Sequence, residues 1–352
     1  MAREKQPTVY EVAEAAGVSI ATVSFAFRKP EKVKKETLDR VHAMAEKLGY
    51  FPSETARGLA TGETNTYGFY AFDMLLDRAM HQGEGQDDNL EIDPFAFPLY
   101  IDEVQRGFQL QCSIENKSLL VSSGPRDFEK AISGLVGRVD GLAAFPGSST
   151  DRVIERIAER IPVVLFNRPP VDGRCVALTS DNALGISLLV NHLVQVHGYR
   201  TIEYVGKLRW PDISTRFTEL QKALRAAHCS VPPRPWSEMD VVANEGVEQF
   251  RSKLRSSTIL PDAFVCGHDQ IALSVLEVLN SCGLRVPEDV AVVGFDGILA
   301  TRLVRPTLTT VRQPMVEMGR IAVQILRNGI EAHDNAERLF EPRLLIGQSC
   351  GC

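Results

Sequence analysis

The strongest cluster of positive charge in the sequence lies near its N-terminus. Six basic side chains fall within 13 residues: Arg28, Lys29, Lys32, Lys34, Lys35 and Arg40. Such a density of Lys and Arg is typical of a surface that meets phosphate groups. A solvated lysine face is the alternative interpretation, and charge alone does not separate the two.

This basic cluster belongs to a segment whose charge differs in sign from the rest of the chain. Residues 1–62 hold 10 Lys and Arg against 8 Asp and Glu, whereas the remainder holds 29 against 37, for a net charge of −6. The whole chain is therefore not a nucleic-acid coat protein. Apolar residues at 44% and charged residues at 24% are average for globular proteins, which excludes collagen-like and wholly disordered chains.

Residues that start and stop helices surround the cluster. Thr8 and Glu11 form the capping-box pattern of a first helix, which Gly17 ends. Ser19 is expected to cap a second helix after this tight turn. A third helix is predicted at about 35–48, where apolar residues recur at helical spacing. Two short helices joined by a tight turn that contains Gly are typical of a helix-turn-helix.

The second helix of such a motif places its first turn in the major groove of DNA. Some of its residues carry hydroxyl groups that can bond to phosphates or bases: Ser19, Thr22 and Ser24. Others offer only apolar contact, for example to thymine methyl groups: Ile20, Ala21 and Phe25. The DNA contacts expected from the three helices are Thr8, Ser19, Ile20, Ala21, Thr22, Ser24, Phe25, Arg28, Lys34 and Lys35.

Two blocks, TVYEVAEAAGVSIATVSFAF and ETLDRVHAMAEKLGYFPSETARGLATG, resemble the DNA-binding headpiece of the LacI family of bacterial transcription regulators. The resemblance implies a hinge helix at residues 53–60 that orders on the operator and contacts DNA through Ala56 and Leu59. It also implies that Leu59 wedges into the central minor-groove step and kinks the DNA. A short linker with an exposed leucine is the alternative.

Two positions depart from the family's pattern. Phe25 stands where members often carry arginine, and Arg28 stands where they often carry asparagine. An arginine can read guanine through two hydrogen bonds. Phe25 therefore predicts an operator half-site whose outer bases differ from those read by family members with arginine at this position. The DNA-binding role carries over from the family, whereas the DNA sequence that is read does not.

From Tyr67 onward, short apolar runs alternate with helical stretches, which is typical of βα units around parallel sheets. Strands are expected at 67–72, 118–122, 139–145, 162–166, 201–206, 262–267 and 290–295. Helices are expected at 100–115, 126–137, 150–160, 183–197, 214–228, 244–256, 269–282 and 314–330.

This region is similar to the periplasmic-binding-protein-like core of the same family, in blocks such as IPVVLFNRP, PDAFVCGHDQIAL and GLRVPEDVAVVGFDG. The expected fold is therefore an N-terminal all-α helix-turn-helix headpiece followed by an α/β periplasmic-binding-protein-like core of two parallel-sheet subdomains. The predicted domains are 1–52 for the helix-turn-helix, 53–65 for the hinge and linker, and 66–352 for the effector-binding core. The resemblance implies crossings near 170, 298 and 338, with an N-subdomain at about 66–170 and 299–338 and a C-subdomain at about 171–298 and 339–352.

A small effector is expected in the cleft at the carboxyl ends of the strands. Four positions match the family's effector contacts: Asn167, Arg216, His268 and Asp296. Arg216 and Asp296, expected on opposite rims, keep the usual residue types and suit a hydroxylated or anionic ligand. Asn167 stands where aspartate is common and His268 where asparagine is common, which argues against a standard sugar.

Each of these positions also has a purely structural interpretation. Arg216 could lie at the surface, His268 could form a buried pair with Asp269, and Asp296 could cap a turn. The stretch 77–98 fits neither the family nor a regular element, since GEGQDDNLEID carries five carboxylates and no Lys or Arg. It is expected to be a mobile acidic loop or a lid at the cleft mouth.

No catalytic constellation and no cofactor motif emerges, because GxSxG, P-loop and HExxH patterns are all missing from the sequence. His192 and His197 lie five apart on one predicted helix without a thiol or carboxylate partner at ligand spacing. Cys350 and Cys352 could bind a soft metal, but two thiols do not complete a tetrahedral site. No metal site is therefore predicted, and the C-terminus is expected to be a frayed tail.

These observations predict a DNA-binding transcriptional regulator, a repressor, whose affinity for a pseudo-palindromic operator is controlled by a small, sugar-like effector. A homodimer is expected because one short helix reads too few bases to be specific. Scattered cysteines and the lack of a secretory or long apolar segment indicate the cytoplasm. The alternative is a cytoplasmic small-molecule sensor without specific operator recognition, and an enzyme is not expected.

Overall fold

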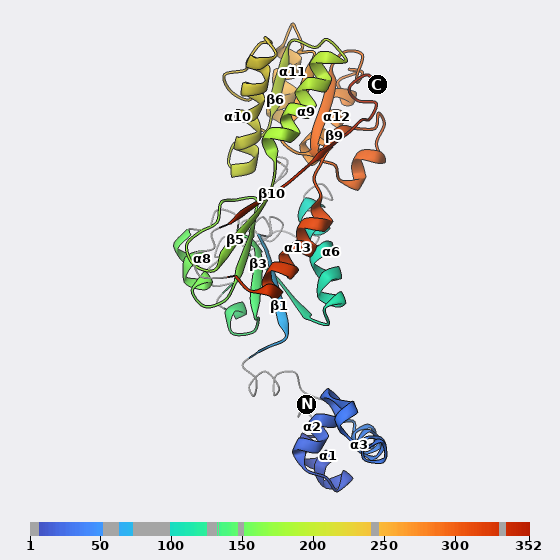
Figure 1. The fold of residues 1–352 in the computed structure, drawn as a ribbon. Helices are drawn as coiled ribbons and strands as arrows, with labels where there is room; N and C mark the ends of the chain where they lie inside the picture. Colours follow the sequence, from blue (N-terminus) through green and yellow to red (C-terminus); the bar gives the residue numbers. More distant parts are fainter. Residues whose placement is uncertain are drawn as a thin grey trace, which may run out of the picture. The chain divides into compact units, whose positions relative to one another are not determined.

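The structure is a computed structural model. It describes residues 7–51, 63–72, 99–124, 132, 134–146, 151–240, 246–330 and 336–352. The chain divides into two compact units, Met1–Thr64 and Asn65–Cys352 (Figure 1). The predicted hinge helix with Ala56 and Leu59 lies outside the described residues, and so does the acidic stretch 77–98.

The smaller unit is a helix-turn-helix with a third helix packed against it. Its elements are α1 (Val9–Ala16), α2 (Ile20–Arg28), a 3-10 turn (Pro30–Lys32) and α3 (Lys35–Leu48). The axes of α1 and α2 meet at 102°, within the range of about 90–120° that is usual for this motif. Its core consists of small side chains from all three helices: Val12, Ala13, Ala16, Val23, Ala26, Val41 and Ala45.

The helix starts form as the sequence predicts. The Thr8 backbone N–H donates to Glu11 Oε2 at 2.6 Å and the Glu11 N–H donates to Thr8 Oγ1 at 3.4 Å, which completes the capping box. Ser19 Oγ accepts from the Thr22 N–H at 3.1 Å. Gly17 ends α1 with a φ of 63°, a left-handed conformation that glycine adopts without strain.

The larger unit contains two sheets. The first has the order β10-β5-β4-β3-β1-β2 and is parallel throughout. The second has the order β11-β9-β8-β7-β6 and is parallel except for the β11–β9 pair. The strands are β1 (Thr66–Phe72), β2 (Ser118–Gly124), β3 (Gly141–Phe145), β4 (Val163–Phe166), β5 (Cys175–Ser180), β6 (Ile202–Val205), β7 (Ala263–Cys266), β8 (Ala291–Asp296), β9 (Thr309–Arg312), β10 (Glu337–Phe340) and β11 (Arg343–Leu345).

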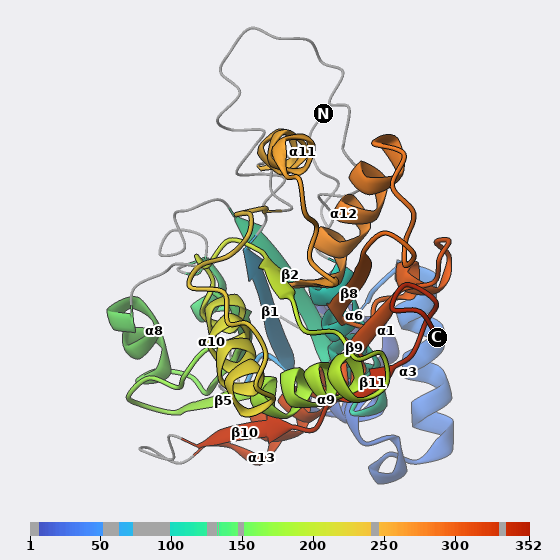
Figure 2. The same cartoon turned by 90° about the horizontal axis from the view of Figure 1, so that it is seen from above.

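Helices cover both faces of each sheet. They are α6 (Leu99–Ile114), α8 (Asp151–Ala158), α9 (Asn182–Gln195), α10 (Pro211–Ala226), α11 (Val247–Ser256), α12 (Asp269–Ser281) and α13 (Met315–Asn328). The apolar sides of α6 and α13 pack on one face of the first sheet, and α8 packs on the other. Figure 2 shows α9 and α10 on one side of the second sheet and α11 and α12 on the other. Of the predicted helices, 126–137 lies largely outside the described residues.

The chain crosses between the sheets later than expected. β5, ending at Ser180, still belongs to the first sheet, and β9, ending at Arg312, belongs to the second. The crossings expected near 170 and 298 are therefore wrong, and the last crossing follows Phe340. The first subdomain comprises residues 65–180 and 313–340, and the second comprises 181–312 and 341–352. These crossings were implied by the resemblance alone, because neither 175–180 nor 309–312 was expected to be a strand.

Among the described residues, no single helix has the length and apolarity to cross a membrane, although α1 and α2 pass the same test when they are joined as one bent pair.

The helices α6 and α13 approach so closely that each needs a glycine at the crossing. A Cβ atom on Gly107 would lie 2.0 Å from the carbonyl oxygen of Val316, and one on Gly319 would lie 2.0 Å from that of Val104. Backbone atoms cannot move aside as a flexible side chain does. These two glycines therefore set the distance between the helices that cover one face of the first sheet.

Replacing Gly107 with alanine is expected to lower the free energy of unfolding by at least about 1–3 kcal/mol through overpacking. Urea denaturation followed by circular dichroism measures the change. Gly134→Ala is the matched control, since Gly134 is exposed, helical and has no atom within 4 Å of an added Cβ. Equal unfolding midpoints for the two variants would contradict the close crossing.

Candidate DNA-binding surface and effector site

The recognition helix α2 presents apolar side chains to solvent. Ile20 and Phe25 are each 41% exposed, and Ala21 is exposed as well, whereas Val23 and Ala26 are buried against the other helices. Large apolar side chains on a helix that already has a buried face are free to contact a partner. The structure thus leaves the apolar residues expected to read bases available on the surface.

The hydroxyl residues of this helix have local partners. Ser19 Oγ lies 2.9 Å from Thr22 Oγ1 in addition to capping the helix, and Thr8 Oγ1 donates to Glu11 Oε2 at 2.9 Å. Hydroxyls can still accept a further bond from a ligand or donate one after rotation. Ser24 is half-buried, and its carbonyl accepts from Arg28 Nε at 3.4 Å.

All six basic side chains of the N-terminal cluster are exposed. They extend from Arg28 on α2, through the 3-10 turn, to Lys35 and Arg40 on α3. Exposure fits both contact with phosphates and a solvated lysine face. Tyr10, which the sequence did not single out, is 67% exposed on α1 and is a further apolar surface residue of this unit.

Arg216 of the effector-binding core is only 2% exposed and has several polar partners. Its Nε donates to Asn182 Oδ1 at 2.9 Å, and its Nη1 donates to the carbonyl of Gly267 at 2.7 Å. Its guanidinium also lies 3.9 Å from the centre of the Phe295 ring. The interpretation of Arg216 as a surface residue is therefore wrong.

Two carboxylates complete the surroundings of Arg216. Asp212 Oδ2 lies 3.3 Å from Nη2, one helical turn earlier on α10, and Asp296 Oδ1 lies 3.7 Å from Nη1. Arg216 and Asp296 are therefore direct neighbours in the second subdomain, and the expectation that they hold opposite rims of the cleft is wrong. The signal for Asp212 was present in the sequence, since oppositely charged residues four apart on a helix face each other.

Asp296 lies at the end of β8 in a strained, buried position. Its φ of 126° is rarely adopted by a residue other than glycine. Burial raises the pKa of its carboxyl well above the usual range, while the nearby Arg216 opposes that change. Gln313 Nε2 donates to Asp296 Oδ1 at 2.6 Å, and the buried Gln313 Oε1 has no hydrogen-bond partner among the described residues.

His268 begins α12 and is half-buried beside Arg216. Burial, and secondly the charge of Arg216, lower its pKa to about 3, so the ring is neutral at physiological pH with one donor and one acceptor. The carboxylate of the fully buried Asp269 accepts from Thr310 Oγ1 at 2.5 Å and from the Ile298 N–H at 2.9 Å. Asp269 thus connects α12 to β9 and to the segment that follows β8, and among the described residues it has no hydrogen bond to His268.

Asn167 belongs to the other subdomain. It follows β4 with a φ of 56°, in the left-handed region that asparagine tolerates, and its Oδ1 accepts from the Tyr100 hydroxyl at 3.1 Å. Tyr100 on α6 was not expected in the site, and nothing in its sequence neighbourhood marks it.

A pocket of about 240 Å³ lies where the two subdomains meet. Its lining includes Asn167 and Thr179 from the first subdomain and Asn182 and Asp212 from the second. The last two residues are partners of Arg216. Of the four expected effector contacts, only Asn167 lines this pocket. Arg216 and Asp296 are buried in the second subdomain, and the half-buried His268 lies beside Arg216.

Comparisons with known proteins cover nearly the whole chain. Residues 8–53 match the family described as bacterial regulatory proteins, lacI family, and residues 190–350 match a periplasmic binding protein-like domain. The HTH-type transcriptional repressor PurR of Haemophilus influenzae (strain PittEE) is 28% identical over 97% of this chain and 98% of its own length. The ribose operon repressor of Escherichia coli (strain K12) is 28% identical over 91% of this chain and 92% of its own length.

Solved structures show the same fold. The lac repressor dimer bound to operator and the anti-inducer ONPF superposes with a TM-score of 0.78 at 23% identity, covering 98% of this chain and 99% of that one. The transcriptional regulator CelR in its cellobiose complex gives a TM-score of 0.65 at 24% identity, covering 97% and 99% of the two chains. With its helix-turn-helix unit and its two-sheet periplasmic binding protein-like core, the chain belongs to the lacI family of bacterial regulatory proteins.

Proposed function

We propose that this lacI-family regulator is a transcriptional repressor that binds a pseudo-palindromic operator as a dimer and responds to a small molecule. The observation that carries the proposal is the presence, in one chain, of a helix-turn-helix unit with an exposed α2 face and a two-subdomain core with a pocket at its boundary. The names of PurR and of the ribose operon repressor describe repressors, and the lac repressor structure is a dimer on its operator.

Footprinting on the DNA around the gene tests this function directly. Protection of a pseudo-palindrome, changed by one class of small molecule, is the expected result. No protection at any effector concentration would instead favour a small-molecule sensor without operator recognition.

We infer further that the pocket binds its ligand without converting it and that the protein acts in the cytoplasm.

The DNA contacts we assign are those of the exposed α2 face, the basic cluster and the hinge. Ile20, Ala21 and Phe25 are placed against base edges, and Lys34 and Lys35 against phosphates. The other side chains assigned to DNA are Thr8, Ser19, Thr22, Ser24, Arg28, Ala56 and Leu59.

Replacing Lys34 or Lys35 with alanine is expected to weaken binding to operator and to random DNA alike, because a phosphate contact carries no sequence information. The slope of log Kobs against log salt concentration should fall in magnitude by about 1 for each lost contact. Fluorescence anisotropy at several salt concentrations measures both effects. Lys222→Ala is the control, since it removes an exposed lysine that belongs to the effector-binding domain and not to the helix-turn-helix unit. A slope that changes as much in this control would contradict the assignment.

The exposed Phe25 predicts the base preference at the outer half-site. Selection from a random DNA library is expected to enrich A·T pairs opposite this residue or to show almost no base preference there. A phenyl ring cannot donate the hydrogen bonds that the O6 and N7 acceptors of guanine require. The Phe25→Arg variant should gain a preference for guanine in the same selection. Strong enrichment of guanine by the unchanged protein would rule out the apolar reading.

The pocket's charge narrows the class of effector. Its lining includes the carboxylates of Asp181, Asp212 and Glu337, and its basic residue Arg168 forms an ion pair with Asp151. Nearby, the guanidinium of Arg216 already faces four protein acceptors. We therefore propose a neutral ligand rich in hydroxyl groups, which can donate to these carboxylates, in preference to an anionic one.

A thermal-shift panel of neutral pentoses, hexoses and nucleosides, each paired with its phosphate ester, tests this charge preference. A neutral compound is expected to raise the unfolding temperature and its ester to have little effect, because the ester brings negative charge toward carboxylates. For the compound found, Asp212→Asn should weaken binding at least about tenfold, since one charged hydrogen bond is worth about 1.5–3 kcal/mol. Operator affinity without ligand should stay within a few fold.

Glu219→Gln is the matched control for this variant. It removes a carboxylate from the same helix, α10, but Glu219 pairs with Lys222 and does not line the pocket. A panel in which only the phosphate esters shift the unfolding temperature would reverse our assignment of ligand charge.

A further inference from the structure

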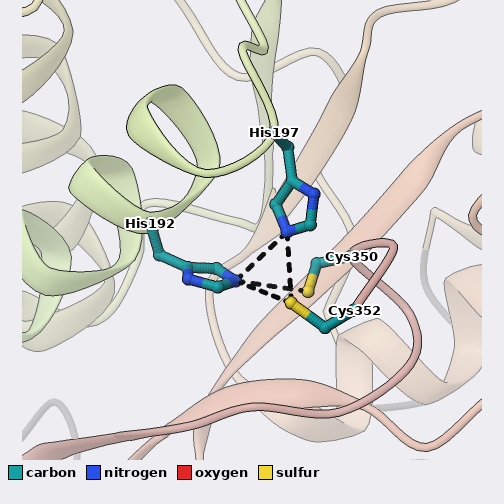
Figure 3. A group of neighbouring side chains, drawn as sticks. All are labelled: His192, His197, Cys350 and Cys352. Atoms are coloured by element: carbon teal, nitrogen blue, oxygen red, sulfur yellow. Dashed lines mark hydrogen bonds between the residues drawn. The ribbon is translucent and has the colours of Figure 1, made fainter.

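Four side chains that can bind a metal converge where the C-terminus of the chain meets the end of α9 (Figure 3). His192 lies in the last turn of α9 and His197 follows the helix, while Cys350 and Cys352 come from the end of the chain. One ligand atom from each residue lies within 4.8 Å of the other three. The expectation that the two histidines lack a thiol partner is therefore wrong.

The spacing of these atoms fits one tetrahedral ion. An ion about 2.0–2.1 Å from nitrogen and about 2.3 Å from sulfur holds its ligand atoms about 3.3 Å (N to N) and about 3.6 Å (N to S) apart. The two histidine Nε2 atoms are 3.2 Å apart. His192 Nε2 lies 3.4 Å from Cys350 Sγ and 3.5 Å from Cys352 Sγ, and His197 Nε2 lies 3.4 Å from Cys352 Sγ. These four of the six edges of the tetrahedron agree with the expected lengths to within about 0.2 Å, and the other two edges are no longer than 4.8 Å.

The tail that carries the thiols is fixed by hydrogen bonds and is not frayed. Ser349 Oγ donates to the carbonyl of Val292 on β8 at 2.5 Å and accepts from the Thr309 N–H on β9 at 2.9 Å. The Tyr199 hydroxyl donates to the carbonyl of Cys350 at 2.9 Å. Gly351 has a φ of 104°, a conformation open to glycine that turns the chain between the two cysteines. The ligands are thus held in place by protein contacts alone.

Neighbouring groups support the ligands as the outer partners of a metal site do. The Thr309 hydroxyl lies 3.0 Å from Cys350 Sγ, where it can donate to a thiolate. The Tyr199 ring stacks on the His197 ring with a centroid distance of 5.2 Å and an interplanar angle of 21°. His192 and Cys350 are buried, whereas Cys352 is exposed and leaves a path for an ion to enter.

We propose that His192, His197, Cys350 and Cys352 bind one Zn²⁺ ion in a structural site that fastens the C-terminus to α9. Two imidazole nitrogens and two thiolates in a tetrahedral arrangement are a ligand set that zinc prefers. Since four protein ligands leave no open position, the site is structural and not catalytic. The argument for this metal site rests neither on the proposed DNA contacts nor on the assignment of the effector pocket.

Metal analysis of the full chain, produced without a histidine tag and in zinc-supplemented medium, tests the site. Inductively coupled plasma mass spectrometry is expected to find one zinc per chain after gel filtration, and Cys352→Ser or His197→Asn should reduce this to a small fraction. Both side chains are at least partly exposed, so neither replacement leaves a cavity in the core. Cys282→Ser, outside the cluster, is the matched control and should keep its zinc.

Two further measurements distinguish a specific four-ligand metal site from adventitious metal binding. Cobalt substitution should give the visible bands of a tetrahedral ion together with thiolate-to-cobalt charge transfer, and both should disappear in Cys352→Ser. Chelation should lower the unfolding temperature of the unchanged protein but not that of Cys352→Ser.

Three results would overturn the proposal. Zinc far below one per chain in the unchanged protein is the first, and loss of zinc from Cys282→Ser as large as from Cys352→Ser is the second. The third is an intact mass, measured after purification in reductant, that corresponds to a Cys350–Cys352 disulfide.

Discussion

The second subdomain depends on the burial of one positive charge. The guanidinium of Arg216 is withdrawn from water, a change that costs several kcal/mol unless hydrogen bonds and opposite charges compensate for it. Its partners come from the start of α9 (Asn182), the end of β7 (Gly267), α10 itself (Asp212) and the end of β8 (Asp296). Each of these elements must therefore reach its native position before the charge is satisfied, which couples the edge of the cleft to the fold of the whole subdomain.

Because the same side chains border the pocket, binding and folding share their contacts. Asn182 and Asp212 line the pocket while they hold Arg216, and Asp296 accepts from Gln313, the residue that directly follows β9 at a crossing to the first subdomain. On that crossing Arg312 also pairs with Glu103 of α6, with an N···O distance of 2.7 Å. A ligand that changes the bonds of Asp212 thus acts on groups that already connect the two subdomains, which is the physical requirement for a shift between two arrangements.

Local chemistry made much of this fold predictable from the sequence. The caps at Thr8 and Ser19, the strands with several adjacent apolar residues and, among the described residues, the helices between them form where their patterns indicated. β9 was not predicted because its two threonines are polar, although both have hydrogen-bond partners in the fold: Thr309 Oγ1 accepts from the Gly347 N–H at 2.8 Å, and Thr310 Oγ1 donates to Asp269. No local pattern marks hydrogen-bond partners that lie about 40 residues away in the sequence. With β5 and β9 missing from the expected strands, the residue pattern offered no correction to the crossings that the resemblance implied.

The effector site and the metal-binding cluster were predictable to different degrees, because both depend on contacts between residues that lie far apart in the sequence. Resemblance singled out Asn167, Arg216, His268 and Asp296 as expected effector contacts. It could not show that Arg216 and Asp296 form an ion pair, that Tyr100 donates to Asn167 or that Gln313 donates to Asp296. The metal-binding cluster joins residues more than 150 positions apart, so the histidines and the thiols each appeared incomplete alone.

Both sites nevertheless depend on one helix. Asn182 at the first turn of α9 borders the effector pocket, and His192 in its last turn points to the cysteines of the tail. A helix of 14 residues spans about 21 Å, and buried side chains hold α9 along its length from Asn182 to Val194. Fastening its far end to β8 and β9 through the tail restrains the position of its near end, where Asn182 meets Arg216. The geometry of the pocket therefore rests on two anchors of α9: the buried guanidinium at its start and the C-terminal tail at its end.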